Sequence, residues 1–169
     1  DFHLKDSLDR TWQCGTVQLD FQLPKNFDLY YIDEKGERQR PIMIHRVCFG
    51  SVERFIGILT EHCGGRFPFW LAPLQVKVLT VTESAEDYAT NVYEKIKEAG
   101  IRSAIDKRRE KIGYMIREAQ YKERVPYAII IGDKEKNSGL ISVRERDSGK
   151  TEVVRTEEFI ERAFKYTNM

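Results

Sequence analysis

The first third of the chain alternates apolar and polar positions in a way that predicts strands. Between residues 16 and 23 every second side chain is apolar, from Val17 to Leu23, which is the period of a half-buried antiparallel strand. A proline ends this segment, and the apolar residues 42–44 predict a second strand that runs into His45.

From Ser51 onward the period becomes that of a helix. Apolar side chains from Val52 to Leu59 recur at i, i+3, i+4 and i+7, and the paired glycines 64–65 supply a left-handed stop. Residues 66–73 then carry two prolines among aromatic side chains, which predicts an ordered connector and a domain boundary after residue 72.

Beyond the connector, strand and helix patterns alternate. Ser84 with Asp87 three positions later is a helix N-cap signature, and residues 127–131 are continuously apolar, as in a strand covered by helices on both faces. The order predicts an α/β domain over residues 73–169, with a mixed sheet flanked by helices. Strands are expected at 76–81, 101–105, 127–131, 140–146 and 153–154, and helices at 84–99, at 111–121 and from 156 onward.

Composition describes a soluble globular protein of one or two domains, with 169 residues that are 41% hydrophobic and 33% charged. No segment approaches the ~18 to 20 apolar residues of a spanning helix, so membrane proteins are excluded. The chain starts without Met, and we expect a piece of a larger protein. The odd number of cysteines, three, indicates reduced thiols and a cytoplasmic localisation.

A basic stretch between residues 102 and 124 carries eight cationic side chains against four carboxylates, although the net charge of the chain is only +1. Such a stretch is either a solvated face or a contact surface for RNA. Near the end of the chain, Arg144 and Arg146 share a strand face with Ser142, so we expect these two arginines to project together from the sheet.

Arg54 stands in the first turn of the helix that Ser51 caps. A cation is disfavoured there by up to ~1 kcal/mol, because it faces the positive end of the helix dipole. With Gly50 allowing close approach, Arg54 and the free N–H groups are suited to bind an anion such as a phosphate. The alternative is a solvated arginine beside Glu53.

His45 lies three residues before Cys48 on the strand that leads to this helix. One interpretation is a metal ligand, but side chains three apart on a strand point to opposite faces, and a lone histidine is more often a hydrogen-bonded core residue. Cys14 and Cys63 form no C-x-x-C pair, so a closed four-ligand zinc site within the chain is not expected.

Several strings of the sequence resemble one family closely, the threonyl-tRNA synthetases. The strings RTWQCGTVQLDF and HRVCFGSVERFIGIL resemble the end of the family's catalytic core, and FWLAPLQV, EKIG and GDKE resemble its anticodon-binding domain. They occupy residues 10–21, 45–59, 69–76, 110–113 and 132–135. The resemblance implies the C-terminal part of a class II catalytic core at residues 1–72, an antiparallel strand–helix remnant, and an anticodon-binding domain at residues 73–169.

The resemblance also implies roles for residues of the first part. Arg54 corresponds to the arginine of the third class II motif, which binds ATP, with Gln13 and Thr16 beside the nucleotide. Gln18 and Ser51 correspond to positions near threonine. His45 corresponds to one of three protein ligands of a catalytic Zn²⁺, a metal that can demand the hydroxyl group that valine lacks. Mg²⁺ would accompany ATP in the parent enzyme.

The family's other two zinc ligands and its first and second motifs lie upstream of the matched strings. We therefore expect a parent enzyme that activates threonine with ATP, attaches it to threonine tRNA and forms a homodimer. The isolated fragment, in contrast, is expected to be inactive as a ligase and monomeric.

In the second part, the resemblance implies contacts with the tRNA anticodon. Glu135 and Arg144 are the candidates for base edges, since a carboxylate accepts from a base amine and a guanidinium donates to a guanine edge. Arg109, Arg117 and Arg124 are the candidates for backbone or supporting contacts. Two alternatives stay open: a non-catalytic RNA-binding or regulatory paralogue, and a related class II ligase such as a prolyl or glycyl enzyme.

Overall fold

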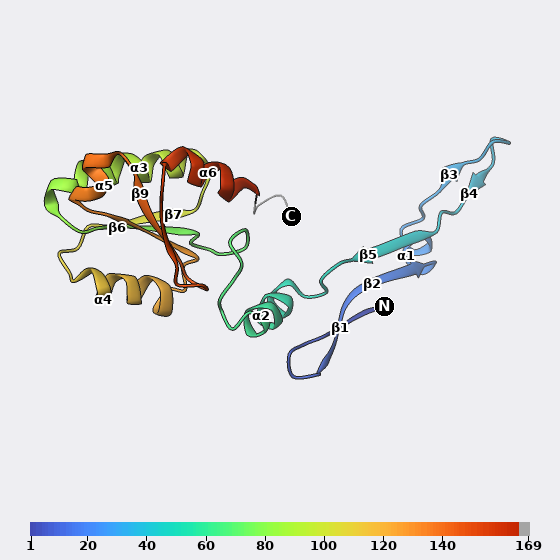
Figure 1. The fold of residues 1–169 in the computed structure, drawn as a ribbon. Coiled ribbons are helices and arrows are strands. Elements are labelled where there is room, and N and C mark those ends of the chain that lie inside the picture. The colour runs from blue at the N-terminus through green and yellow to red at the C-terminus, as the bar shows by residue number, and fades with distance from the viewer. Residues whose placement is uncertain (166–169) are drawn as a thin grey trace. The chain divides into compact units, whose positions relative to one another are not determined.

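The computed structural model describes residues 1–165 and divides into two compact units, which begin at residue 1 and at residue 64 (Figure 1). The first unit is an antiparallel sheet with the strand order β1-β2-β5, followed by a helix. A separate two-stranded ribbon pairs β3 with β4. The elements are β1 (Phe2–Lys5), β2 (Thr11–Asp20), α1 (Gln22–Asn26), β3 (Tyr31–Ile32), β4 (Arg38–Gln39), β5 (Met43–Val47) and α2 (Val52–His62).

Strand β2 starts earlier than the alternation predicted, and it ends at Asp20 rather than at Leu23. The carboxylate of Asp20 accepts hydrogen bonds from the backbone N–H groups of Gln22 at 2.8 Å and Leu23 at 2.9 Å. These bonds turn the chain into α1, so the predicted end of the strand was wrong.

Helix α2 forms as predicted. The hydroxyl of Ser51 accepts from the backbone N–H of Arg54 at 3.3 Å, which is an N-cap. After the helix, Gly64 and Gly65 have φ angles of 55° and 70°, the left-handed region that glycine enters without strain.

The apolar face of this first sheet is exposed within the described chain. Val17, Leu19 and Ile44 lie on the same face of β2 and β5, and their exposed fractions are 52%, 62% and 63%. Two apolar residues of α2, Val52 and Ile56, are also more than half exposed. The strand pairing is antiparallel, as predicted, but residues 1–165 do not bury this face.

The second unit is a five-stranded sheet with the order β10-β9-β8-β6-β7 (Figure 1). The strands β7, β6 and β8 are parallel, whereas β9 and β10 are antiparallel additions, so the sheet is mixed, as predicted. The strands are β6 (Val76–Thr80), β7 (Ser103–Asp106), β8 (Tyr127–Ile131), β9 (Ile141–Glu145) and β10 (Thr151–Val154).

Helices cover both faces of this sheet (Figure 1). One face packs against α3 and α6 in a core that includes Val76, Val78 and Ile129, and the other packs against α4 through Leu79, Met115 and Ala128. All five residues of β6 are buried as a result. The helical elements are the 3₁₀ turn η1 (Glu83–Ala85), α3 (Glu86–Glu98), α4 (Ile112–Arg117), the π-helical turn η2 (Glu118–Lys122), α5 (Asp133–Ser138) and α6 (Thr156–Lys165).

One helix prediction was wrong, and one helix was not predicted. Ser84 does not cap α3, because η1 precedes that helix and the hydroxyl of Ser84 donates to the carboxylate of Asp133 instead. The short helix α5 was not predicted, since its six residues are polar and show no apolar period.

The connector packs with the second unit. Phe69 is buried in its core, with its ring 5.6 Å from that of Tyr127, and the side chain of Gln75 donates to the Phe69 carbonyl at 2.9 Å. The two units meet in sequence at residues 63 and 64. The domain boundary that the sequence suggested after residue 72 stays a prediction.

Leu79 is fully buried on the α4 face of the sheet. We predict that Leu79→Ala lowers the free energy of unfolding of the second unit by about 2 to 5 kcal/mol, because it leaves a cavity. Urea denaturation followed by circular dichroism would measure this. Val153→Ala, at a position 60% exposed, serves as the control and should change stability by about 0.5 kcal/mol or less. Equal effects of the two variants would contradict the core assignment.

Candidate functional site

Arg54 and Gln13 are brought together in the first unit. The Nη2 atom of Arg54 donates to the backbone carbonyl of Gln13 at 2.7 Å, which ties the first turn of α2 to strand β2. Gly50 has a φ of 67°, and a Cβ there would lie 3.0 Å from Arg54 Nη2 and 3.1 Å from the Cys14 carbonyl. The turn therefore needs glycine. Arg54 remains exposed beside the helix N-terminus, where its guanidinium can meet an anion.

Thr16, Gln18 and His45 lie on one face of the first sheet. Gln18 stands directly opposite His45 in the pairing of β2 with β5, and Thr16 stands opposite Val47. The hydroxyl oxygen of Thr16 is buried and has no hydrogen-bond partner among the residues that the structure describes. Residues predicted near ATP and near threonine thus share a surface.

The ring of His45 is oriented by Asp20. The His45 Nε2 atom lies 2.8 Å from Asp20 Oδ2, and since a carboxylate only accepts, Nε2 is the nitrogen that donates. The backbone N–H of Leu23 and the hydrogen bond from His45 together hold the pKa of Asp20 below its ordinary value.

A carboxylate behind an imidazole is the usual support of a metal-ligating histidine. Among residues 1–165, however, no group of three or more His, Cys, Asp and Glu side chains is placed to hold a metal ion. The donor set therefore fits one ligand of a metal centre and not a complete centre. The hydroxyl of Ser51 also donates to Glu53 at 2.9 Å, in addition to its role as a cap.

In the second unit, both carboxylate oxygens of Glu135 already accept hydrogen bonds. Oε2 accepts from the backbone N–H of Gly132 at 3.0 Å, and Oε1 accepts from the hydroxyl of Ser142 at 2.6 Å. Burial raises the pKa of Glu135, but these hydrogen bonds outweigh it, and the pKa is lowered. Glu135 is thus ionised and held in place at the N-terminus of α5, where its side chain caps the helix. Its carboxylate has lone pairs beyond those used in these two hydrogen bonds.

Arg144 lies on β9 and on the same face as Ser142. Its Nε atom donates to the side-chain oxygen of Gln120 at 3.2 Å, and Nη1 lies 3.4 Å from the hydroxyl of Thr151. Since Ser142 binds Glu135, the two residues predicted to read bases belong to one row of polar side chains. This row lies on the face of the sheet that α4 covers. Arg144 stands opposite Ala128 in the pairing of β8 with β9, and Ala128 packs against α4.

The other three predicted contacts do not join this row. Arg109 pairs with Glu83 at 2.8 Å in a cleft of about 450 Å³ that is also lined by Thr80 and Lys107. Arg117 is exposed on α4, in a groove of about 370 Å³ with Tyr114 and Tyr121. Arg124 adopts a left-handed φ of 58° after η2. The five candidates therefore lie in several places on the unit.

The expectation that Arg146 projects beside Arg144 was wrong. Only 4% of the Arg146 side chain is exposed, and it donates to the carbonyls of Phe67 and Arg124 at 3.2 and 2.8 Å. It also pairs with Asp147. Arg146 stands just beyond the end of β9, where it fastens the connector and the segment after η2 to the sheet.

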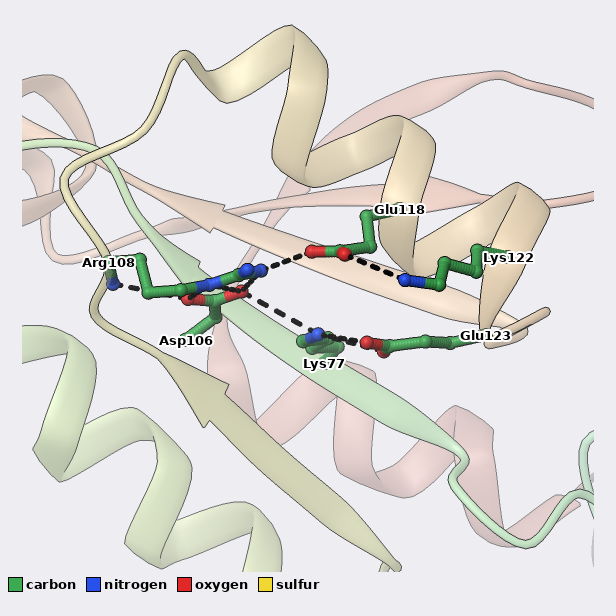
Figure 2. Close-up of polar contacts among 6 residues, drawn as sticks. All are labelled: Lys77, Asp106, Arg108, Glu118, Lys122 and Glu123. Carbon is green, nitrogen blue, oxygen red and sulfur yellow. Dashed lines mark hydrogen bonds and ion pairs between the residues drawn. The ribbon is translucent and has the colours of Figure 1, made fainter.

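Part of the basic stretch is neutralised by an internal charge network, which Figure 2 shows. Lys77, buried on β6, donates to Glu123 at 2.7 Å and lies 3.6 Å from Asp106 on β7. Arg108 binds both Asp106 and Glu118, and Lys122 pairs with Glu118. Arg108 and Lys122 are thus engaged within the protein, so the cationic surface is smaller than the sequence suggested.

The cleft beside Arg109 lies at a topological switch point of the sheet, where successive connections from β6 lead to opposite sides of that strand. From β6 the chain passes through α3 on one face to β7, and from β7 through α4 on the other face to β8, which flanks β6 on its other side. Ligands of α/β sheets bind outside the carboxyl ends of the strands at such a switch point. The hydroxyl of Thr80, which lines the cleft, is buried without a hydrogen-bond partner in the described part of the chain.

Sequence reasoning missed Lys77 and Gln120. Lys77 interrupts an apolar strand, and a lysine there signals a buried ion pair. Gln120 lay inside a predicted helix, and its polar side chain between Ala119 and Tyr121 gave no signal of its own.

Family models match both units. Residues 75–165 match the model described as "Anticodon binding domain", and residues 1–63 match the "tRNA synthetase class II core domain (G, H, P, S and T)". Separately, no helix within residues 1–165 is long and apolar enough to cross a membrane.

Curated relatives are similar over nearly the whole chain. The chain is 61% identical over 160 residues to a threonine–tRNA ligase of Clostridium acetobutylicum, covering 95% of this chain and 25% of that protein. It is 56% identical over 165 residues to that of Caldanaerobacter subterraneus subsp. tengcongensis, covering 98% and 26%. The chain thus spans about a quarter of the length of the curated relatives it matches.

Solved structures agree with these matches. The RNA binding domain of threonyl-tRNA synthetase from Cryptosporidium parvum Iowa II superimposes with a TM-score of 0.88 at 36% identity, over 97% of this chain and 41% of that chain. A prolyl-tRNA synthetase from the same organism has a TM-score of 0.71 at 22% identity, over 94% and 35%, which shows the fold alone. The resemblance noted in the sequence is confirmed.

The charge network predicts an acid dependence of stability. Arg108 lowers the pKa of Asp106 from 3.8 to about 2. Because the folded pKa is the lower one, the stabilisation is complete above pH ~4 and is lost as the pH falls towards 2. Between pH 5 and pH 2, we expect the difference in unfolding free energy between wild type and Asp106→Asn to shrink by about 2 kcal/mol. Denaturant titrations at several pH values would measure it, and a constant difference would contradict the network.

Proposed function

The chain belongs to the anticodon binding domain family, and on that premise we propose that it is part of a threonine–tRNA ligase whose second unit reads the threonine anticodon. The parent enzyme would activate threonine with ATP and attach it to threonine tRNA in the cytoplasm. Identities of 56 to 61% with curated threonine–tRNA ligases support the threonyl branch over the prolyl or glycyl ones.

The observation that carries the proposal is the polar row of Glu135, Ser142 and Arg144. Arg144, whose side chain is half-buried, and Ser142 lie on one face of β9, and the hydroxyl of Ser142 donates at 2.6 Å to the carboxylate of Glu135 on α5. Together they offer donors and acceptors to the edges of unstacked bases, which is how single-stranded RNA is read. Arg144 would donate to a guanine edge, and Glu135 would accept from a base amine.

Arg109, Arg117 and Arg124 would contact the RNA backbone around this row. Their exposure and their separate positions suit phosphate contacts, which orient an RNA but carry little sequence information. Arg109 would have to exchange its pairing with Glu83 for a phosphate. Because both side chains of that pair are about three-quarters exposed, the exchange costs little.

In the first unit, Arg54 would bind ATP and offset phosphate charge as the threonine carboxylate attacks the α-phosphate. The hydrogen bond from Arg54 to the Gln13 carbonyl sets the guanidinium beside β2. Gln13 and Thr16 would lie beside the nucleotide. Gln18 and Ser51 would lie nearer to threonine.

His45 would be one ligand of a zinc ion, with Asp20 holding its ring. The two remaining protein ligands would come from residues outside this chain. When bound, the zinc would supply a ligand position that requires a hydroxyl group, which separates threonine from valine. Mg²⁺ would accompany the phosphates of ATP.

The exposed apolar face of β2 and β5 supports the view that further polypeptide covers the first unit in the parent. Val17, Leu19 and Ile44 present a contiguous apolar surface of the kind that marks an interaction site. We therefore propose that the isolated chain is inactive as a ligase. We also propose that the parent is a homodimer and the isolated chain a monomer, because the resemblance places the first class II motif, which usually builds the dimer interface, upstream of the matched strings.

Arg144→Ala tests the anticodon assignment. We predict that it weakens binding of this chain to an RNA hairpin with the threonine anticodon by about 1 to 3 kcal/mol and spares a hairpin with a changed anticodon. Fluorescence anisotropy at fixed salt would measure both. The control, Arg117→Ala, should weaken both hairpins alike. Equal losses with Arg144→Ala would reassign that residue to a phosphate contact.

His45→Ala tests the zinc assignment in the full-length parent. We expect loss of bound zinc, measured by elemental analysis, and loss of threonine-dependent pyrophosphate exchange, because one of three ligands is gone. The matched control is His62→Ala, at an exposed histidine in the last turn of α2. A variant at His45 that retains zinc and activity would defeat the assignment.

A further inference from the structure

Gln120 is a buried polar side chain that contacts Arg144 at both ends of its amide. Only 5% of Gln120 is exposed. Its Nε2 donates to the Arg144 carbonyl at 3.2 Å, and its Oε1 accepts from Arg144 Nε at 3.2 Å. A reversed amide would set donor against donor and acceptor against acceptor, so these partners fix the orientation of the amide.

The π-helical turn η2 is what turns Gln120 toward the sheet. The backbone N–H of Glu123 donates to the Glu118 carbonyl at 2.9 Å, five residues back, which is the bond of a π turn. Ala119 and Gln120 are both buried within this turn. Such turns are rare and occur frequently at functional sites.

Ion pairs fasten both ends of η2 to the parallel strands (Figure 2). At the start of the turn, Glu118 binds Arg108, which also binds Asp106 of β7. Just past its end, Glu123 binds the buried Lys77 of β6 at 2.7 Å. Gln120 lies between these two attachments in the sequence, so the backbone that carries its side chain is fixed on the sheet.

The contacts of Arg144 leave one edge of its guanidinium available. Nε is taken by Gln120, and one hydrogen of Nη1 points to Thr151 at 3.4 Å. Of the five N–H donors of an arginine, the second on Nη1 and both on Nη2 have no protein partner within residues 1–165. Ala128, which is paired with Arg144 on β8, has a short side chain and leaves room on this face.

We propose that Gln120 is a positioning residue for base reading: by holding Nε, it presents the Nη1–Nη2 edge of Arg144 to a base with two adjacent acceptors, which is guanine. Guanine offers O6 and N7 side by side, and a guanidinium binds them with two parallel hydrogen bonds. This inference rests on the proposed role of Arg144 in anticodon reading. A solely structural role for Gln120 would instead affect all RNAs alike.

The test compares Gln120→Leu with wild type in the 169-residue chain. Leucine has nearly the same volume as glutamine but removes both hydrogen bonds. We expect the ratio of dissociation constants for hairpins with changed and threonine anticodons to fall roughly tenfold, with the salt dependence unchanged. In an Arg144→Ala background, Gln120→Leu should have no further effect on this ratio.

Further variants complete the design. Gln120→Glu keeps an acceptor for Arg144 Nε but loses the donor to the Arg144 carbonyl. Because the proposal assigns the positioning to the contact with Nε, this variant should weaken both hairpins through its added negative charge but preserve the ratio. Circular dichroism of each variant checks that it is folded, and Gln120→Met, which also removes both hydrogen bonds, replaces Gln120→Leu if that variant does not fold. Lys122→Ala, at an exposed position of η2 that pairs with Glu118, is the matched control and should leave the ratio unchanged.

The outcomes separate this inference from the proposed function. If Arg144→Ala brings the ratio of dissociation constants to about one but Gln120→Leu does not lower it, the role of Arg144 in anticodon reading stands and the positioning role of Gln120 is overturned. Equal losses for both hairpins with Gln120→Leu, or a lowered ratio with Gln120→Glu, also overturn it. If Arg144→Ala leaves the ratio unchanged, both the role of Arg144 in anticodon reading and the positioning role of Gln120 are overturned.

Discussion

The buried ammonium group of Lys77 is the constraint on which one whole face of the second unit depends. The strand that carries it, β6, lies between two parallel neighbours and is buried along its length. A buried charge must be paired, and Lys77 is paired with Asp106 from β7 and Glu123 from the end of η2. Satisfying this charge therefore requires α4 and η2 to lie across the sheet in a fixed position.

That fixed position has a consequence for the rest of the face. With η2 held over the sheet, Gln120 reaches Arg144, and Arg144 shares its strand face with Ser142, which binds Glu135. The residues proposed to read bases are thus supported by a charge network whose centre, Lys77 and Asp106, is buried. These side chains are already held in one conformation, so they lose less conformational entropy on binding RNA than exposed lysines and arginines do.

Much of this fold could be predicted from the sequence, whereas the contacts between distant segments could not. Apolar runs such as Tyr127–Ile131 identified the strands, and the periodicity after Ser51 identified α2. The six polar residues of α5 have no period to detect, and a π turn such as η2 leaves no trace in an apolar pattern. The partners of Lys77 and Gln120 lie 46 and 24 residues away, so their roles depend on the strand order. The family resemblance supplied the site residues, Arg144 among them. The alternation along the strand, in contrast, did not distinguish Arg144, which is half-buried, from Arg146, whose side chain is buried.

The most direct test of the account is a map of RNA binding on the chain itself. Backbone amide resonances of the ¹⁵N-labelled 169-residue chain would be followed by NMR during titration with a hairpin that carries the threonine anticodon. We predict that the largest changes fall on Glu135, Gln120, Ser142 and Arg144, and that a hairpin with a changed anticodon perturbs them less. Changes that concentrate on α3 and α6, on the opposite face of the sheet, would contradict the account.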